Sequence, residues 1–137
     1  MHVFFDSAAF AKRYIQEAGT DTVLEWCERA TVLSLTLIAL PELISAFCRL
    51  RREGVLNETQ YQEVKSAMTL DLEDASLCEL TPAVLTKTVW HLEQNVPRGM
   101  DAIHIASALT MKAEIFMTSD RRQSEAATRA GLRVVFV

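Results

Sequence analysis

Short runs rich in apolar, β-branched and aromatic residues alternate along this chain with longer segments of helical periodicity. The runs that are too short for helices cover residues 3–5, 31–36, 114–119 and 132–137, and a further strand is expected at 77–81. Nearly continuous apolar runs are typical of strands buried on both faces of a parallel sheet. The alternation therefore predicts an α/β fold, a three-layer sandwich with a central parallel sheet and helices on both faces.

The segments between these runs predict the helices. They comprise residues 7–17, a helix that starts at Asp21, a helix that ends near Glu53, and residues 57–73, 82–94, 102–111 and 121–130. Gly54 and Gly131 each follow a predicted helix, as is common at helix C-termini. The chain has 137 residues and no linker or low-complexity stretch, so a single domain over residues 1–137 is expected.

Composition limits the class of protein. Half of the residues are apolar and 23% are charged, which is typical of a compact globular domain. The three cysteines are widely spaced, which argues against a disulfide framework and for the reducing cytoplasm. Neither a secretory signal nor an apolar stretch of membrane length is found, so a cytoplasmic protein without membrane contact is expected. The net charge of −4 argues against nucleic-acid binding by bulk attraction alone.

Four acidic residues stand where predicted elements begin or end. Asp6 and Asp120 each directly follow an apolar run. Asp101 opens an apolar helix, and Glu42 lies within an apolar stretch. Ligands bind beyond the carboxyl ends of parallel strands, so carboxylates from different strands can share one site there. Gathered carboxylates repel one another unless a hard divalent cation binds them, so the sequence predicts a magnesium-type site and phosphate-ester chemistry.

Each acid also has an ordinary explanation when it is taken singly. Asp101 could complement a helix dipole, and Glu42 could face solvent. Asp6 and Asp120 could cap turns. The four together are more specific than any one of them.

Several stretches make the chain recognisable as a member of a known family. They are Phe5-Asp6-Ser7-Ala8-Ala9, Glu42-Leu43, Met100-Asp101-Ala102-Ile103-His104-Ile105-Ala106-Ser107-Ala108 and Phe116-Met117-Thr118-Ser119-Asp120. Over essentially its whole length the chain resembles the PIN-domain nucleases, and most closely the VapC-type toxins of bacterial toxin–antitoxin pairs. The resemblance implies an endoribonuclease that cleaves RNA phosphodiester bonds, forms a homodimer and is held inactive by a small antitoxin protein.

The resemblance also assigns roles to individual residues. It implies that Asp6, Glu42, Asp101 and Asp120 form the catalytic centre and hold Mg²⁺ or Mn²⁺. The small hydroxyl residues Ser7 and Thr118 are expected on the substrate side of this centre. The chain departs from many relatives in two ways, because Ala8 stands in place of a serine and no Asp or Asn follows closely after Asp120, where Arg121, Arg122 and Gln123 stand instead.

Two further residues near Asp101 are candidates for the site. Arg98, in the short Pro-Arg-Gly loop before Asp101, is the basic residue best placed to bind an RNA phosphate. His104 lies one helical turn beyond Asp101 and could act as a base or a ligand. The family pattern instead favours a packed, supporting histidine.

Other functions are open to a chain of this kind. A haloacid-dehalogenase-like phosphatase needs Asp-x-Asp, and Ala8 stands where the second acid should be. A Ser-His-Asp triad built on Ser7 or Ser119 leaves the other carboxylates unexplained. The alternative that remains is a PIN-like fold acting as a non-catalytic regulatory or RNA-binding module.

Two apolar features bear on partners and on the core. Residues 35–40, with Leu43, Ile44 and Phe47, are more apolar than one helix face requires. This surplus marks either an interface or a central helix buried on several sides. Trp26 and Trp90 lie in apolar helical patterns and are expected in the core.

Overall fold

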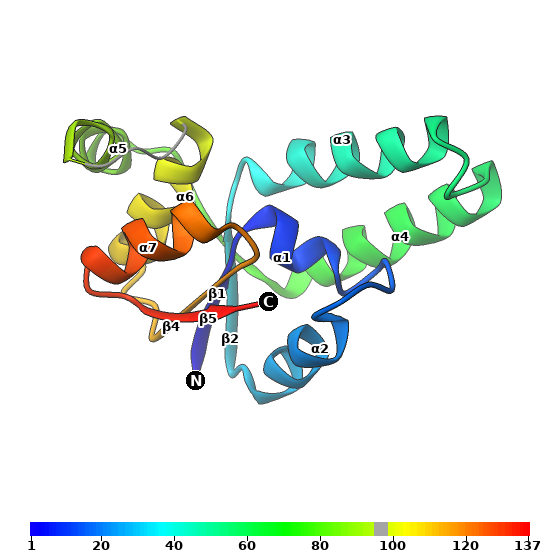
Figure 1. Ribbon diagram of the computed structural model, residues 1–137, viewed down its shortest axis with the longest axis horizontal. Helices are drawn as coiled ribbons and strands as arrows, with labels where there is room; N and C mark the ends of the chain where they lie inside the picture. The colour runs from blue at the N-terminus through cyan, green and yellow to red at the C-terminus, as the bar shows by residue number, and fades with distance from the viewer. Residues whose placement is uncertain (95–98) are drawn as a thin grey trace.

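The structure, a computed structural model, describes residues 1–94 and 99–137 (Figure 1). Its centre is a five-stranded sheet in which every paired strand runs parallel to its neighbour. The strand order is β3-β2-β1-β4-β5. The strands are β1 (His2–Phe5), β2 (Val32–Thr36), β3 (Ser76–Cys78), β4 (Ile115–Thr118) and β5 (Arg133–Phe136).

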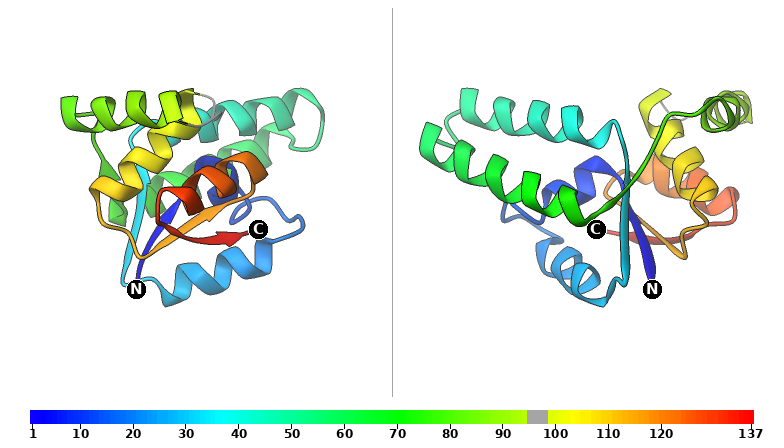
Figure 2. Two further views of the ribbon diagram at one scale, coloured as in Figure 1. Left: turned by 60° about the vertical axis from the view of Figure 1, so that its left-hand side comes forward. Right: turned by 180° about the vertical axis from the view of Figure 1, so that it is seen from behind.

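Helices cover both faces of this sheet, as Figures 1 and 2 show. They are α1 (Ser7–Ala11), α2 (Thr20–Arg29), α3 (Ala39–Arg52), α4 (Glu58–Asp74), α5 (Pro82–Gln94), α6 (Gly99–Thr110) and α7 (Arg121–Arg129). Helices α1 to α4 lie on one side, and α5 to α7 lie on the other. The predicted three-layer α/β sandwich with a parallel sheet is therefore confirmed.

The alternation of side chains along β1 divides the core between the two faces. Val3 and Phe5 are fully buried in the cluster formed with α1 to α4. Phe4 points the other way and stacks on Phe116 of β4, its partner in the strand register, with ring centroids 5.8 Å apart. Because each face of the strand is buried, all three residues are apolar.

The first helix is much shorter than the predicted helix at 7–17. It ends at Ala11, and the chain continues through tight turns in which the N–H groups of Lys12, Arg13 and Tyr14 donate three residues back. The side chains of Arg13 and Tyr14 both donate to Asp71 of α4, at 2.9 and 2.6 Å. These hydrogen bonds to α4 are formed where α1 would otherwise continue by another turn.

Other predicted ends differ less. The helix predicted at 57–73 is α4, Glu58–Asp74, and Asn57 caps it in a complete capping box with Gln60. Strand β3 covers 76–78 rather than 77–81. Trp26 is buried as expected, but the prediction for Trp90 was wrong because this residue is 56% exposed. No helix in residues 1–94 and 99–137 is long and apolar enough to cross a membrane.

Candidate functional site

The four predicted acidic residues come together at the carboxyl edge of the sheet. Asp6 follows β1 and caps α1, while Asp120 follows β4 and caps α7. Glu42 and Asp101 lie in the first turns of α3 and α6. All four line one cavity of about 120 Å³, together with Ser7, Ala8, His104 and Gln123. The convergence follows from the topology, because β1 and β4 are neighbours and end at the same edge.

Asp6 is the most deeply buried of these acids, with 3% of its surface exposed. Its Oδ1 accepts from the backbone N–H of Ala9 at 2.7 Å, and its Oδ2 accepts from the hydroxyl of Thr118. Burial raises the pKa of Asp6, and the charge of His104 and these two hydrogen bonds offset only part of the effect. A carboxylate in this setting is costly to ionise unless a cation joins it.

Glu42 is held by two donors on a single oxygen. The hydroxyl of Ser7 donates to Glu42 Oε1 at 2.7 Å, and Nε2 of His104 lies 2.8 Å from the same atom. Partial burial raises the pKa of Glu42, but the hydrogen bonds from His104 and Ser7 and the charge of His104 outweigh it, so the pKa is lowered. Glu42 is therefore an ionised carboxylate at neutral pH, with Oε2 directed to neither of these donors.

His104 supports Glu42 rather than filling the core alone. The ring is 2% exposed, and its contact with Glu42 joins residues 62 positions apart in the chain. An ionised carboxylate can only accept, so Nε2 carries the hydrogen in this pair. Among the residues that the structure describes, the buried Nδ1 atom of His104 has no hydrogen-bond partner.

The two hydroxyl residues predicted to contact substrate occupy different positions. Ser7 lines the cavity and donates to Glu42. Thr118 is fully buried, and its hydroxyl lies within hydrogen-bond distance of Asp6 Oδ2, of Gln123 Oε1 (3.0 Å) and of the backbone N–H of Asp120 (3.0 Å). Thr118 thus contacts Asp6 from the interior of the protein, and because it is fully buried it has no exposed surface for a substrate to contact.

Gln123 is the residue of this site that the sequence prediction missed. It is 1% exposed, and its amide reaches both Thr118 and the backbone carbonyl of Asp101. A signal was present, because Asp120-x-x-Gln123 has the spacing of a helix N-terminal capping box. The backbone N–H of Gln123 does donate to Asp120 Oδ1 at 2.8 Å, but its side chain points into the site instead of back to the cap.

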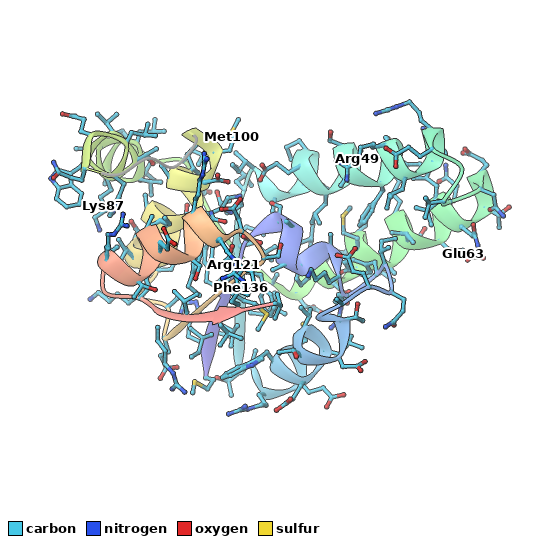
Figure 3. The ribbon with its side chains drawn as sticks, in the orientation of Figure 1. Arg49, Glu63, Lys87, Met100, Arg121 and Phe136 are labelled. Carbon is cyan, nitrogen blue, oxygen red and sulfur yellow. The ribbon has the colours of Figure 1, made fainter. Side chains whose placement is uncertain are left out.

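Most basic residues near the acids along the chain have other partners. Lys12 donates to the carbonyl of Ala18, Arg13 pairs with Asp71, and Arg51 pairs with Glu58. Arg121 lies over the ring of Phe136, with its Cζ atom 5.0 Å from the ring centroid. Both residues are labelled in Figure 3. Arg98 lies outside the described residues. The other four basic side chains thus have contacts outside the acidic cavity, and none of them lines it.

The donor set of the cavity fits a hard divalent cation. It offers carboxylate oxygens from four elements, and no lysine or arginine of the described residues lines it. No three of these side chains, in residues 1–94 and 99–137, are already arranged as a complete metal-binding group. Asp6 and Asp120 each turn one carboxylate oxygen toward a helix N-terminus.

A wider, mainly apolar groove continues from the acidic cavity. Its volume is about 610 Å³, and it shares Glu42 and Asp101 with the smaller cavity. Its other lining residues come from α5 and α6 and are Thr88, Leu92, Gly99, Met100 and Ile103. Met100, labelled in Figure 3, is exposed at the start of α6.

Comparison with known proteins identifies the class to which this fold and site belong. The sequence pattern of the PIN domain matches residues 3–129, and the chain belongs to the PIN domain family. The chain is 30% identical to Ribonuclease VapC45 of Mycobacterium tuberculosis strain CDC 1551, over 96% of this chain and 93% of that protein. The family resemblance inferred from the motifs is thus confirmed.

Solved structures show the same fold at low sequence identity. The crystal structure of Mycobacterium tuberculosis VapC20, a sarcin–ricin loop cleaving toxin, matches with a TM-score of 0.70 and 16% identity, over 98% of this chain and 99% of that chain. A toxin–antitoxin complex from Klebsiella pneumoniae matches with a TM-score of 0.66 and 13% identity, over 88% of each chain.

Proposed function

We propose that this protein is a divalent-metal-dependent endoribonuclease that hydrolyses RNA phosphodiester bonds, and that it is the toxin of a bacterial toxin–antitoxin pair. The observation that carries the proposal is the convergence of Asp6, Glu42, Asp101 and Asp120 on one small cavity. Its kinship with Ribonuclease VapC45 supports RNA as the substrate. Mg²⁺ or Mn²⁺ fits the all-oxygen donor set.

The residues of the cavity have different roles in this proposal. Asp6, Asp101 and Asp120 would hold the cation, and Glu42 lines the same cavity. A bound Mg²⁺ or Mn²⁺ supplies an activated water and neutralises charge on the scissile phosphate. Glu42 would accept a proton from the attacking water or orient it, and Ser7 and His104 hold the carboxylate of Glu42 in place.

The hydroxyl residues and Arg98 take supporting parts in this proposal. Ser7, which lines the cavity, is close enough to the acids to meet substrate as well as Glu42. Thr118 acts from below by holding Asp6, because it is fully buried. Arg98 remains our predicted phosphate contact, from its place in the sequence before Asp101.

Removal of divalent cations should abolish RNA cleavage by the purified protein. The reason is that Asp6 is buried, and burial makes its charged form costly unless a bound cation offsets the charge. We would measure cleavage of a labelled RNA in excess chelator and after addition of Mg²⁺ or Mn²⁺. Full activity in excess chelator would contradict the proposal. Metal binding without any cleavage would favour the non-catalytic RNA-binding or regulatory module.

We also propose a small antitoxin protein as partner, by analogy with the toxin–antitoxin complex from Klebsiella pneumoniae, and a homodimer. The apolar residues at 35–47 belong partly to the core and partly to the surface. Leu43 and Phe47 are buried, whereas Leu37 and Leu40 are 47% and 46% exposed. A second exposed stripe lies along α5, where Leu85, Val89 and Leu92 follow at helical spacing. Exposed apolar stripes of this kind mark interaction surfaces.

The α5 stripe gives a prediction about self-association. We expect the wild-type protein to be a dimer at micromolar concentration, and Val89→Asp to shift it to a monomer because a charge would enter the apolar contact. Val55→Asp is the matched control, because Val55 is similarly exposed, at 56% against 53%, in the turn after α3. Size-exclusion chromatography with light scattering measures the mass. A wild-type protein that is strictly monomeric would contradict the dimer.

A further inference from the structure

A single buried amide connects three of the four acidic residues of the site. Gln123 is 1% exposed and is among the largest fully buried side chains of the described structure. Glutamine is seldom buried so completely, and a buried amide must find hydrogen-bond partners to offset its desolvation. The hydrogen-bond partners of Gln123 therefore indicate its role.

Each polar group of Gln123 reaches a different part of the acidic cavity. Its backbone N–H donates to Asp120 Oδ1 at 2.8 Å. Its Nε2 donates to the backbone carbonyl of Asp101 at 3.0 Å. Its Oε1 lies 3.0 Å from the hydroxyl of Thr118, which in turn contacts Asp6. The contacts thus extend from α7 to the first turn of α6 and to the end of β4.

The orientation of this amide is fixed by its surroundings. A carbonyl oxygen can only accept, so the NH₂ group must face Asp101 and Oε1 must face Thr118. Thr118 is itself held by the backbone N–H of Asp120, at 3.0 Å. The side chain of Gln123 thus links the segment that carries Asp101 to Thr118, which contacts both Asp6 and the backbone of Asp120.

The packing of the two helices does not need this amide. Helices α6 and α7 meet through an apolar cluster that contains Ile105, Ala108, Ala126 and Ala127. That cluster lies beyond the first turn of α6, where Asp101 is placed. Apolar packing therefore holds the two helices together, while the contacts of Gln123 lie at their N-terminal ends.

We propose that Gln123 is a positioning residue that fixes the relative placement of Asp6, Asp101 and Asp120, and thereby sets the affinity of the site for divalent cations. The inference rests on the proposed function, because it assumes that these acids hold a cation. Outer residues that orient metal ligands typically contribute about 10- to 100-fold to metal affinity or activity. Gln123 is such an outer residue by its contacts, although it is not one of the carboxylates that would bind the cation.

Gln123→Met tests the proposal, because methionine keeps the length of the side chain and removes both of its polar contacts. We expect Mn²⁺ to bind about 10- to 100-fold more weakly by calorimetry, and cleavage to recover substantially when Mn²⁺ is raised to saturation. Gln62→Met is the matched control, since Gln62 is exposed on α4, donates its side-chain amide to Glu58 and does not line the acidic cavity. Its Mn²⁺ affinity should equal that of the wild type.

The outcomes separate this inference from the proposed function. A wild-type protein that binds no Mn²⁺ would refute the metal centre itself. A wild-type protein that binds Mn²⁺, with Gln123→Met binding it within twofold of the wild-type affinity, would overturn the role of Gln123 alone. A lowered thermal midpoint with unchanged affinity would count as the same refutation, since it shows a purely structural residue.

A measurement on the wild-type protein decides the matter if Gln123→Met does not fold. The side-chain amide protons of Gln123 should exchange slowly with water, because one is donated to a buried contact. Their NMR signals should shift as Mg²⁺ is added, with the same midpoint as Mg²⁺ binding by calorimetry. Signals that stay unshifted at saturating Mg²⁺ would overturn the proposal.

Discussion

Asp6→Asn should abolish RNA cleavage and, in the metal-free protein at pH 7, should raise the thermal midpoint of unfolding. The first effect is expected because asparagine lacks the charge with which Asp6 would hold a hard cation. Outer residues of metal sites already contribute 10- to 100-fold, so we expect the loss of a direct ligand to exceed about 100-fold in activity. The second effect follows from the burial of Asp6, which is 3% exposed.

An asparagine at position 6 can keep every contact of the aspartate. Its Oδ1 can accept from the N–H of Ala9, and its amide can donate to the hydroxyl oxygen of Thr118. The hydroxyl hydrogen of Thr118 is then free to go to Gln123 Oε1, 3.0 Å away. The substitution therefore removes a buried charge without leaving a polar group unsatisfied, and the fold should be preserved.

The gain in stability should depend on pH, with a sign that the pKa of Asp6 determines. Burial raises this pKa in the folded protein, so the folded state binds the proton more tightly than the unfolded state. The cost of ionising Asp6 is absent below its ordinary pKa of about 4, grows as pH rises from there toward the folded-state pKa, and is fully present above that pKa. Asp6→Asn should thus stabilise at pH 7 and lose this advantage near pH 4.

Thermal unfolding in chelator at several pH values, with turnover measured in parallel, would test both effects. Each 1 kcal/mol of relieved cost should raise the midpoint by about 3–6 °C in a chain of this size. Asp74→Asn is the control, because Asp74 is an exposed acid at the end of α4. Near-wild-type turnover in Asp6→Asn would show that this residue is not essential. A lower midpoint at pH 7 would contradict the assignment of a buried, destabilising charge.

The convergence of the acids could be predicted because it depends on sequence position and on one rule of topology. Asp6 and Asp120 directly follow apolar runs, and these runs became β1 and β4. The strands of a parallel sheet end at a common edge, so residues that follow them are brought together. The strand order was not predictable in the same way, because it depends on pairing between distant segments.

Local periodicity failed where a distant contact decided the structure. The spacing of Phe10, Tyr14 and Ala18 suited a helix, yet the chain leaves the helix at Ala11. Tyr14 instead reaches Asp71, 57 positions away in the sequence. Trp90 shows the same limit, because the apolar pattern of α5 covers a buried face and an exposed one.

The supporting residues of the site were hidden for a related reason. The contact of His104 with Glu42 and that of Gln123 with Asp101 join different helices, and no spacing within one segment reveals them. Polar residues at the centre of a fold are defined by their partners, and the partners follow from the complete tertiary arrangement.

The arrangement around Glu42 determines how strongly its substitution should act. Two donors, Ser7 and His104, bind Glu42 Oε1 and leave Oε2 as the oxygen available to a water at the cavity. The pKa of Glu42 is lowered in this environment, so the carboxylate is ionised at neutral pH but is a weak base. General bases contribute most when their pKa is close to the working pH. We therefore place Glu42 at the lower end of the 10²- to 10⁴-fold that is typical of acid–base catalysis.

Glu42→Gln should accordingly lower kcat by about 100-fold at saturating Mn²⁺. The oxygen of the glutamine can still accept from Ser7 and His104, so the substitution changes only the group that faces the water. More Mn²⁺ should not restore the rate, in contrast to a residue whose main effect is on metal affinity. Glu53→Gln at the exposed end of the same helix should leave kcat unchanged. If added Mn²⁺ did restore Glu42→Gln, Glu42 would be a ligand of the cation rather than the residue that prepares the attacking water.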